Sequence, residues 1–236
     1  MNRPSDSPFR FRGKRPEEHH LPDLNPHLKL HYEMVPPVVV AEDAPGFKGR
    51  WGEAFPNPEL PLHLEIGPGN GFYLAGMASR HPEFNWIGIE IRYKRVVLVA
   101  RKINAAGAQN ARIARYDAWQ LGDLFEAGEL SGLHINFPDP WKREVNAKHR
   151  LINPALVAWA ASALRSGGEI RVKSDHRPNV QRFVDCATDQ PISVVDFRDD
   201  VENNGTPWPD DLVTNYQSKF IKRGEPVYAA MLRRDD

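Results

Sequence analysis

A glycine turn between two apolar segments that carry acids at their ends constrains this chain more than any other feature. Residues 62–66 form a short apolar run that carries Glu65 into the turn Gly67-Pro68-Gly69-Asn70-Gly71. A second apolar run, residues 84–89, ends on Glu90, nineteen residues after the last glycine of the turn. Short apolar runs bounded by turn residues are typical of buried strands, and glycine lets a backbone approach a ligand without a Cβ in the way. The pattern predicts a ligand cradle with a carboxylate at each of two strand ends.

The spacing of the glycines indicates which ligand suits this turn. Dinucleotide sites use Gly-x-Gly-x-x-Gly, whereas here the third glycine comes one residue early. A carboxylate beside the turn also repels a pyrophosphate, because like charges in a partly desolvated cleft are costly. Carboxylates suit an ammonium or a sulfonium, and Glu90 can accept both hydroxyl protons of a ribose. We therefore predict S-adenosylmethionine as the cofactor, and the alternative is a structural glycine turn without a ligand.

Length and composition set bounds on the class of protein. The chain has 236 residues, enough for one α/β domain and an extension. Its formal net charge is zero, so affinity for nucleic acid must come from local patches. The single cysteine, Cys186, indicates a reducing compartment. No apolar stretch reaches the roughly 20 residues of a membrane helix, and the basic, proline-rich N-terminus lacks the apolar core of a signal peptide. We expect a cytoplasmic protein, either a monomer or a homodimer.

The order of apolar segments predicts an α/β fold of the Rossmann-like type. We expect a mostly parallel seven-stranded sheet with helices on both faces and an antiparallel edge. Residues 1–60 are expected to form an irregular N-terminal extension, flexible in its first part, ahead of a domain at 61–236. The spacing of histidines, acids and cysteine predicts no metal site. The expected strands are 62–66, 84–90, 111–115, 132–136, 168–174, 192–197 and 226–233, and the expected helices are 71–80, 92–106, 152–165 and 177–188.

Ligands of such sheets bind beyond the carboxyl ends of the strands. Acids stand at several of the predicted ends, namely Glu65, Glu90, Asp117, Asp139 and Asp175. We therefore expect these side chains to gather around one site.

The fourth of the expected strands runs into an unusual loop, Asn136-Phe137-Pro138-Asp139-Pro140-Trp141. The two prolines restrain the backbone on either side of Asp139, so the loop aims this carboxylate. Asp139 can accept hydrogen bonds from the amino and imino edge of a guanine. Trp141 offers a face on which an unpaired base can stack, worth about 1–3 kcal/mol. The alternative is a turn with a buried tryptophan.

Two basic stretches accompany these elements. Solvated helix faces are the simpler interpretation, but beside a stacking aromatic they indicate a phosphate-binding rim. A polar, aromatic and basic segment, 214–220, adds a predicted lid over the substrate. The basic stretches contain Arg92, Lys94, Arg95, Arg101 and Lys102, and then Lys142, Arg143, Lys148, His149 and Arg150.

Over about residues 60–232 the chain resembles the bacterial tRNA (guanine-N7-)-methyltransferase family. The Phe137–Trp141 run with its basic tail is the most specific part of the match. The other matching motifs are Glu65-Ile66-Gly67 with its glycine turn, Gly88-Ile89-Glu90, Asp117, Lys148–Arg150, Ser174-Asp175 and the segment from Thr214 to Gly224. The resemblance implies a class I methyltransferase that transfers a methyl group from S-adenosylmethionine to N7 of a guanine in tRNA, in the variable loop.

The resemblance also implies roles for individual residues. It assigns contact with the cofactor to Glu65, Glu90, Asp117 and Asp139, with Asp139 central to catalysis, and the turn adds Gly67, Gly69 and Gly71. It assigns contact with tRNA or guanine to Arg143, Asp175, Thr214, Asn215, Tyr216 and Gln217, beside Trp141.

Two departures from the family pattern concern the substrate. The basic run after Trp141 is thinner than usual, and Gln217 stands where a glutamate is common. An amide keeps an acceptor without the charge. Two alternatives follow: a methyltransferase that acts on another amino group or base, and a tRNA-binding protein without catalysis.

Overall fold

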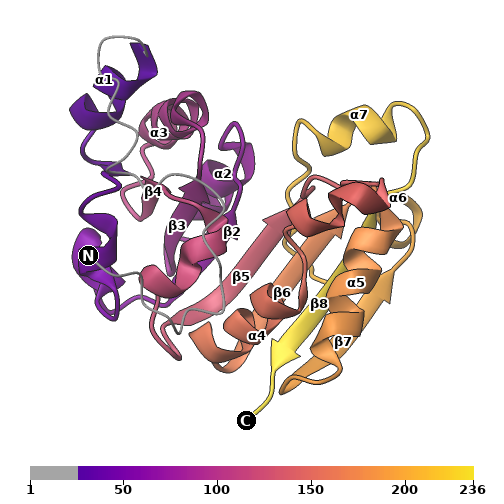
Figure 1. Cartoon of the computed structure of the whole chain (residues 1–236). Coiled ribbons are helices and arrows are strands. Elements are labelled where there is room, and N and C mark those ends of the chain that lie inside the picture. Colours follow the sequence, from indigo (N-terminus) through magenta and orange to yellow (C-terminus); the bar gives the residue numbers. More distant parts are fainter. Residues whose placement is uncertain (1–25) are drawn as a thin grey trace.

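The computed structural model describes residues 26–236, which fold around one eight-stranded sheet (Figure 1). The strands are β1 (Val38–Val39), β2 (Leu62–Ile66), β3 (Asn85–Glu90), β4 (Ala111–Arg115), β5 (Leu130–Asn136), β6 (Leu164–Ser174), β7 (Ile192–Arg198) and β8 (Tyr228–Arg234). Their order across the sheet is β1-β4-β3-β2-β5-β6-β8-β7. β8 runs antiparallel to both of its neighbours, β6 and β7, and the other pairings are parallel. The predicted mostly parallel sheet with antiparallel pairing towards one edge is confirmed.

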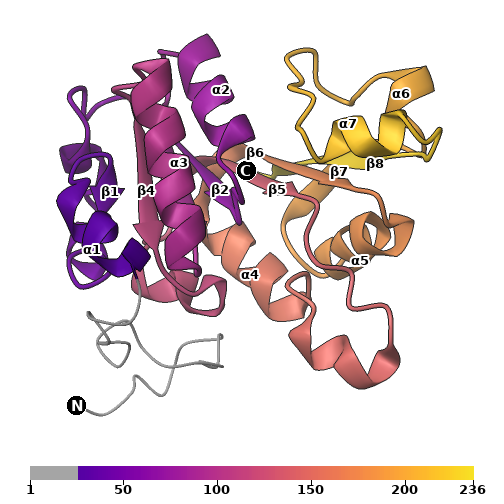
Figure 2. The same cartoon turned by 90° about the horizontal axis from the view of Figure 1, so that it is seen from above.

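Helices cover both faces of this sheet, as Figure 2 shows from above. α2 (Phe72–Arg80) and α3 (Tyr93–Ala106) lie on one face, and α4 (Pro154–Ala163) and α5 (Arg177–Ala187) lie on the other. The short helices α6 (Val201–Asn204) and α7 (Gln217–Ile221) stand on the same side as α2. The remaining elements are α1 (Pro26–Glu33) and the 3₁₀ helices η2 (Ala44–Phe47), η3 (Trp51–Ala54), η4 (Ala118–Asp123) and η5 (Glu144–His149).

Local sequence explains where these elements begin and end. All five residues of β2 are buried, as expected for a central parallel strand covered on both faces. α4 starts where Oδ1 of Asn153 accepts a 3.1 Å hydrogen bond from the amide of Leu156, with Pro154 in the first turn. α3 ends at Gly107, whose φ of 62° is the left-handed conformation that glycine adopts without strain.

The number of strands differs from the prediction, because the sheet has eight strands and not seven. The additional strand is β1, only two residues long, which pairs with Ile113 and Ala114 of β4. Two residues carry no periodicity, so this strand forms through its distant partner alone. The helix expected at 152–165 ends at Ala163, and β6 begins at Leu164, opposite Leu130.

The predicted boundary at residue 60 stays a prediction. The flexible segment expected at residues 1–25 lies outside the described residues. Within residues 26–236, no helix combines the length and the apolar character needed to span a membrane.

Candidate functional site

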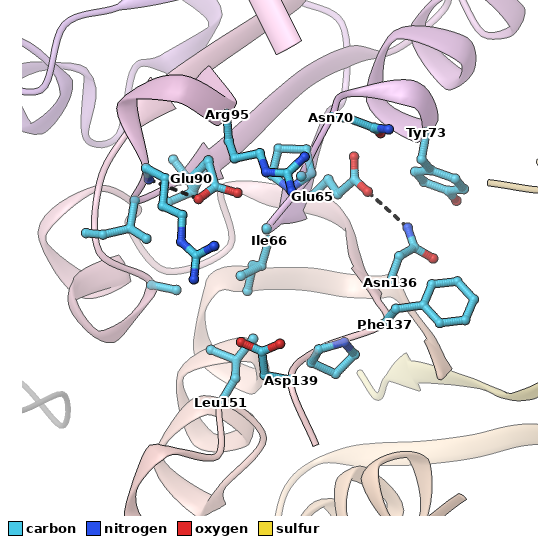
Figure 3. A pocket seen from close by; sticks show the side chains of 18 of the residues that line it. Glu65, Ile66, Asn70, Tyr73, Glu90, Arg95, Asn136, Phe137, Asp139 and Leu151 are labelled. Atoms are coloured by element: carbon cyan, nitrogen blue, oxygen red, sulfur yellow. Dashed lines mark hydrogen bonds between the residues drawn. The ribbon is translucent and has the colours of Figure 1, made fainter. Parts of the chain in front are cut away.

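A cavity of about 620 Å³ opens at the carboxyl ends of β2, β3 and β5 (Figure 3). The turn after β2, the loops after β4 and β5 and the segment before α7 contribute to its walls. The sequence-predicted residues that line it are Glu65, Gly67, Gly69, Glu90, Asp117, Asp139, Trp141, Thr214, Asn215 and Tyr216. Gly71, Arg143, Asp175 and Gln217 were also predicted for the site but do not line the cavity.

Glu65 is the most deeply buried acid of this cavity, with 2% of its surface exposed. Its Oε1 accepts a 3.1 Å hydrogen bond from Nδ2 of Asn136 on β5. Its Oε2 is buried and has no hydrogen-bond partner in the described chain. Burial raises the pKa of Glu65 to about 8, although the bond from Asn136, the charge of Lys173 and the backbone amide of Leu74 oppose this shift. The carboxyl group is thus only partly satisfied by the chain, and Oε2 can accept a hydrogen bond from a ligand.

The three glycines of the turn have different surroundings. Gly67 and Gly69 have φ values of 70° and 59°, and a Cβ added to Gly67 would meet no atom within 4 Å. Gly71 also has a positive φ, but a Cβ added there would lie 2.7 Å from Cα of Val99 on α3. The first two glycines leave this part of the cavity wall without side chains, whereas Gly71 allows α2 to start close against α3.

Two further acids stand at the ends of β3 and β4. Oε1 of Glu90 accepts a 3.0 Å hydrogen bond from the amide of Arg92, and Oδ1 of Asp117 accepts one of 3.0 Å from the amide of Trp119. Burial raises the pKa of both carboxyl groups. Backbone amides thus orient both acids at the edge of the cavity: the amide of Trp119 holds Asp117, and the amides of Arg92 and Ile91 hold Glu90.

The loop that follows Asn136 and runs to Trp141 forms another wall of the cavity, and Asp139 lies across the cavity from Glu65 and Glu90 (Figure 3). The amide of Phe137 donates a 2.7 Å hydrogen bond to the carbonyl of Lys173, and Nδ2 of Asn179 donates one of 3.0 Å to the carbonyl of Pro138. Phe137 and Trp141 adopt φ values of 51° and 39°. Left-handed backbone at residues other than glycine is strained and concentrates at functional sites. The loop is therefore held in an unfavourable conformation that presents Asp139.

The late segment 214–219 closes the cavity from a third side. Oγ1 of Thr214 accepts a 3.0 Å hydrogen bond from the amide of Gln217, which starts α7. Asn215 and Tyr216 are exposed, but Gln217 is buried away from the cavity and its Oε1 has no partner in the described chain. Burial and the charges of Asp175 and Asp139 raise the pKa of Tyr216. Asp175 therefore lies near the phenol although it does not line the cavity.

Cationic side chains surround the mouth of the cavity. Arg92 and Arg95 at the start of α3 and Lys219 on α7 line the cavity and form no ion pair within residues 26–236. Arg143 and Lys148 in and before η5 are exposed nearby in the chain. Arg150 is partly neutralised by Glu144 at 2.9 Å. Arg92, Arg95 and Lys219 thus place cationic groups, without an ion-pair partner in the described chain, among the residues that line the cavity.

Sequence reasoning missed two residues beneath the cavity. Tyr73 on α2 lines it. Lys173 on β6 is fully buried, and its charge lowers the pKa of Glu65. The charged residues at alternate positions of β6, namely Glu169, Arg171 and Lys173, were the only available signal. In the described part of the chain, no group of three or more His, Cys, Asp or Glu side chains could hold a metal ion.

β8 is an antiparallel strand that lies between β6 and β7. This strand order, with the acid-lined cavity at the carboxyl ends of β2 and β3, is that of a Rossmann-like class I methyltransferase. A mutant of the 16S rRNA (adenine(1408)-N(1))-methyltransferase from Catenulisporales acidiphilia, solved with the cosubstrate SAM, shares this fold. Its TM-score is 0.53 at 12% identity, over 81% of this chain and 91% of that one.

Sequence comparison gives the family. Residues 59–230 match the family model described as putative methyltransferase. The tRNA (guanine-N(7)-)-methyltransferase of Bacillus velezensis is 31% identical over 81% of this chain and 87% of its own length. The enzyme of that name from Listeria welshimeri is 33% identical over 81% and 88%, respectively. The chain belongs to this tRNA (guanine-N(7)-)-methyltransferase family.

Proposed function

We propose that this protein transfers the methyl group of S-adenosylmethionine to N7 of a guanine in tRNA. The observation that carries the proposal is the unpartnered Oε2 of Glu65, buried at the end of β2 beside an open glycine turn. A buried acceptor without a donor is costly, and an ammonium group of a ligand would satisfy it. The family to which the chain belongs supports the same reaction.

The residues of the cavity fit this cofactor. We assign its ammonium to Glu65, its ribose hydroxyls to the second oxygen of Glu90 and the adenine amino group to the second oxygen of Asp117. Gly67 and Gly69 let the ligand pass close to the backbone, and Gly71 supports the turn by its packing. Asp139 lies on the opposite wall, where it can contact both cofactor and acceptor.

The acceptor guanine would then enter between Asp139 and the late segment. Asp139 and Asp175 can accept hydrogen bonds from the amino and imino edge of the base, while Trp141 borders its face. Thr214, Asn215 and Tyr216 form the third wall. Gln217 is buried behind this wall, so we assign it to supporting the wall and not to contact with the base.

Positioning is the main contribution that these residues make to the rate. N7 of guanine carries an in-plane lone pair, so no side chain has to remove a proton before it attacks the methyl carbon. S-adenosylmethionine supplies that carbon on a sulfonium, and the electrons of the broken carbon–sulfur bond remain on sulfur. The chain holds the base in line, which reduces the entropic part of the barrier. The methylated base is positive, and Asp139 stabilises this developing charge.

The cationic rim would hold the phosphates of tRNA around the target base. Arg92, Arg95 and Lys219 surround the mouth, and Arg143 extends the positive surface. A guanine must be unstacked to reach the cavity, which favours a flexible region of the tRNA. The variable loop satisfies this condition, and we propose that the target guanine lies there.

Transfer of labelled methyl groups to unmodified tRNA, followed by nucleoside digestion and chromatography, tests the proposal. We expect the label in 7-methylguanosine, and we expect none with the Asp139→Ala variant. Label in another nucleoside would show a methyltransferase with a different acceptor. Binding of cofactor and tRNA without any transfer would show a tRNA-binding protein instead.

A further inference from the structure

One face of the sheet carries buried and half-buried polar side chains on three neighbouring strands. The register places Glu65 beside His134, His134 beside Arg171 and Asn136 beside Lys173. Residues in register on neighbouring strands point to the same face, so these five side chains share one side of the sheet. It is the side that carries α2, because Oη of Tyr73 on α2 lies 3.0 Å from Nδ1 of His134.

Lys173 is the most deeply buried of these groups, with no exposed surface. Its Nζ donates a 2.7 Å hydrogen bond to Oδ1 of Asp211 and one of 3.4 Å to the carbonyl of Leu212. The same Oδ1 accepts a 3.1 Å bond from Nε1 of Trp208. A buried lysine on the sheet is thus bonded to a segment with no helix or strand, Trp208–Leu212, which we term the anchor segment.

Other contacts hold the anchor segment over the same face. Arg171 donates a 2.8 Å hydrogen bond from Nη1 to Oδ1 of Asp210. The side chain of Leu212 packs so closely on α2 that a Cβ added to Gly76 would lie 2.5 Å from its Cδ1. The anchor segment therefore sits between β6 and α2.

The anchor segment leads directly into the third wall of the cavity. Only Val213 separates it from Thr214, and the wall continues through Asn215 and Tyr216 to Lys219. Lys173 also lies within charge range of Glu65, which belongs to the opposite part of the cavity. One ammonium group is thus placed between the proposed cofactor carboxylate and the base of the proposed substrate wall.

We propose that Lys173 is a positioning residue that, through Asp211, sets the place of the wall Thr214–Lys219 relative to Glu65. The inference rests on the proposed function, which assigns this wall to the acceptor guanine. Lys173 touches neither ligand and acts only through the anchor segment.

The chemistry of the pair explains why a lysine serves this purpose. A buried ion pair contributes little net stability, because the cost of removing both charges from water offsets their attraction. A charge-assisted hydrogen bond is short and directional, however, and leaves one geometry that satisfies both groups. Apolar side chains would bury the same surface but would allow the segment to slide.

Asp211→Asn tests this inference, because an amide keeps the shape of the side chain and its bond from Trp208 while removing the charge. The amide oxygen can still accept from Lys173, so the variant loses only the charge of this bond. We expect the KM for tRNA to rise about tenfold, the difference between a charge-assisted and a neutral hydrogen bond, with the dissociation constant of the cofactor unchanged within about twofold. The matched control is Asp199→Asn. Asp199 forms an exposed ion pair with Arg177, with 2.6 Å between Oδ1 and Nε, and neither residue lines the cavity. The control should leave both constants unchanged.

Hydrogen exchange provides a readout that a general loss of stability would not imitate. In Asp211→Asn, amides of residues 214–221 should exchange faster while those of β2 keep their protection. The measurement needs no methyl transfer, so it tests Lys173 even if the wild-type protein is inactive on tRNA. An unchanged KM, or equal losses of tRNA binding, cofactor binding and protection of β2, would overturn the inference.

A double variant covers the case in which Asp211→Asn does not fold. Lys173→Met combined with Asp211→Leu replaces both charges by apolar groups, which commonly restores the stability of a buried site. The variant also removes the acceptor of Trp208 Nε1, so we expect a folded protein with a somewhat lowered melting temperature. We expect a raised KM for tRNA and faster exchange at residues 214–221. A double variant with the wild-type KM would show that the pair contributes only to stability.

Discussion

Asn136 on β5 donates a 3.1 Å hydrogen bond from Nδ2 to Oε1 of Glu65 on the neighbouring parallel strand β2. The bond satisfies one carboxyl oxygen and leaves the buried Oε2 without a partner. A carboxyl group in this state favours its protonated form, and burial raises the pKa of Glu65 to about 8. A bound ammonium would favour the ionised form, so protonation of Glu65 and cofactor binding oppose each other.

Cofactor affinity should therefore depend on pH through Glu65. Below about pH 8 the free protein must release a proton from Glu65 to bind the ammonium, so affinity should rise about tenfold per pH unit towards pH 8. Above that pH it should fall again, because a free α-amino group loses its proton near pH 7.7–8.0. Titration calorimetry between pH 6 and about pH 9 measures both limbs.

Glu65→Gln is the control for this profile. The amide cannot ionise, so the rising limb should disappear while the falling limb remains, at weaker overall affinity. Heats measured at pH 7 in two buffers of different ionisation enthalpy should show about one proton released by the wild-type protein and none by the variant. A rising limb that survives in Glu65→Gln would assign it to another group.

Gly67→Ala should weaken cofactor binding beyond its effect on stability. A Cβ at Gly67 would stand in open space at the cavity wall, where the ligand passes. Gly107 is a matched control, because it has a φ of 62° and equally open surroundings but lies at the end of α3. Both variants should lose about 1 kcal/mol of unfolding free energy. Only Gly67→Ala should raise the dissociation constant of the cofactor, and equal constants for both variants would contradict the assignment of the turn.

Asp139→Ala should abolish transfer and leave cofactor affinity within about an order of magnitude. The carboxylate faces the cavity from a strained loop, opposite Glu65, and the proposed reaction develops positive charge on the base beside it. Loss of such electrostatic stabilisation lowers kcat by about 10²–10³. Single-turnover transfer and calorimetry on the same preparation separate the two effects. Comparable losses in both would make Asp139 a cofactor ligand instead of a base-positioning group.

Neutralising the rim should weaken tRNA binding in a salt-dependent way. Arg95→Gln and Lys219→Gln each remove a cation that lines the cavity and has no ion pair in the described chain. The logarithm of the tRNA association constant falls linearly with the logarithm of the salt concentration, and each variant should make this slope shallower by about 0.7–0.9. Arg233→Gln is the control, because Arg233 lies at the other end of the sheet beside Glu169 at 3.4 Å. Slopes that do not change in the first two variants would place the tRNA phosphates elsewhere.

Much of the fold follows from local sequence patterns. The seven expected strands and four expected helices are all present, with ends displaced by four residues or fewer. Buried parallel strands are continuous apolar runs, and their ends are marked by glycine, proline and acids, so each can be recognised without its neighbours. β1 was missed because Val38 and Val39 form a strand only beside β4.

The candidate site divides in the same way. Glu65, Glu90, Asp117 and Asp139 each lie at or just after the end of a predicted strand, and the cavity brings them together as the topology of a parallel sheet requires. The sequence predicted that all four residues 214–217 contact the substrate. Gln217 is instead buried in the interior, whereas Asn215 and Tyr216 line the cavity. The turn before α7 decides this, since Oγ1 of Thr214 accepts a hydrogen bond from the amide of Gln217, the first residue of the helix.

The sequence by itself determined the strands, the open glycine turn and the acids that face it, because these depend on burial and on turn geometry within a few residues. Only the tertiary structure decided that Gly71 serves the packing of α2 on α3, and that Lys173 faces Glu65 and Asp211. The last relationship arises from the register of three strands and from a segment 38 residues further along the chain. Contacts over such separations leave no periodic trace in the sequence, because each partner alone is a single charged residue among many.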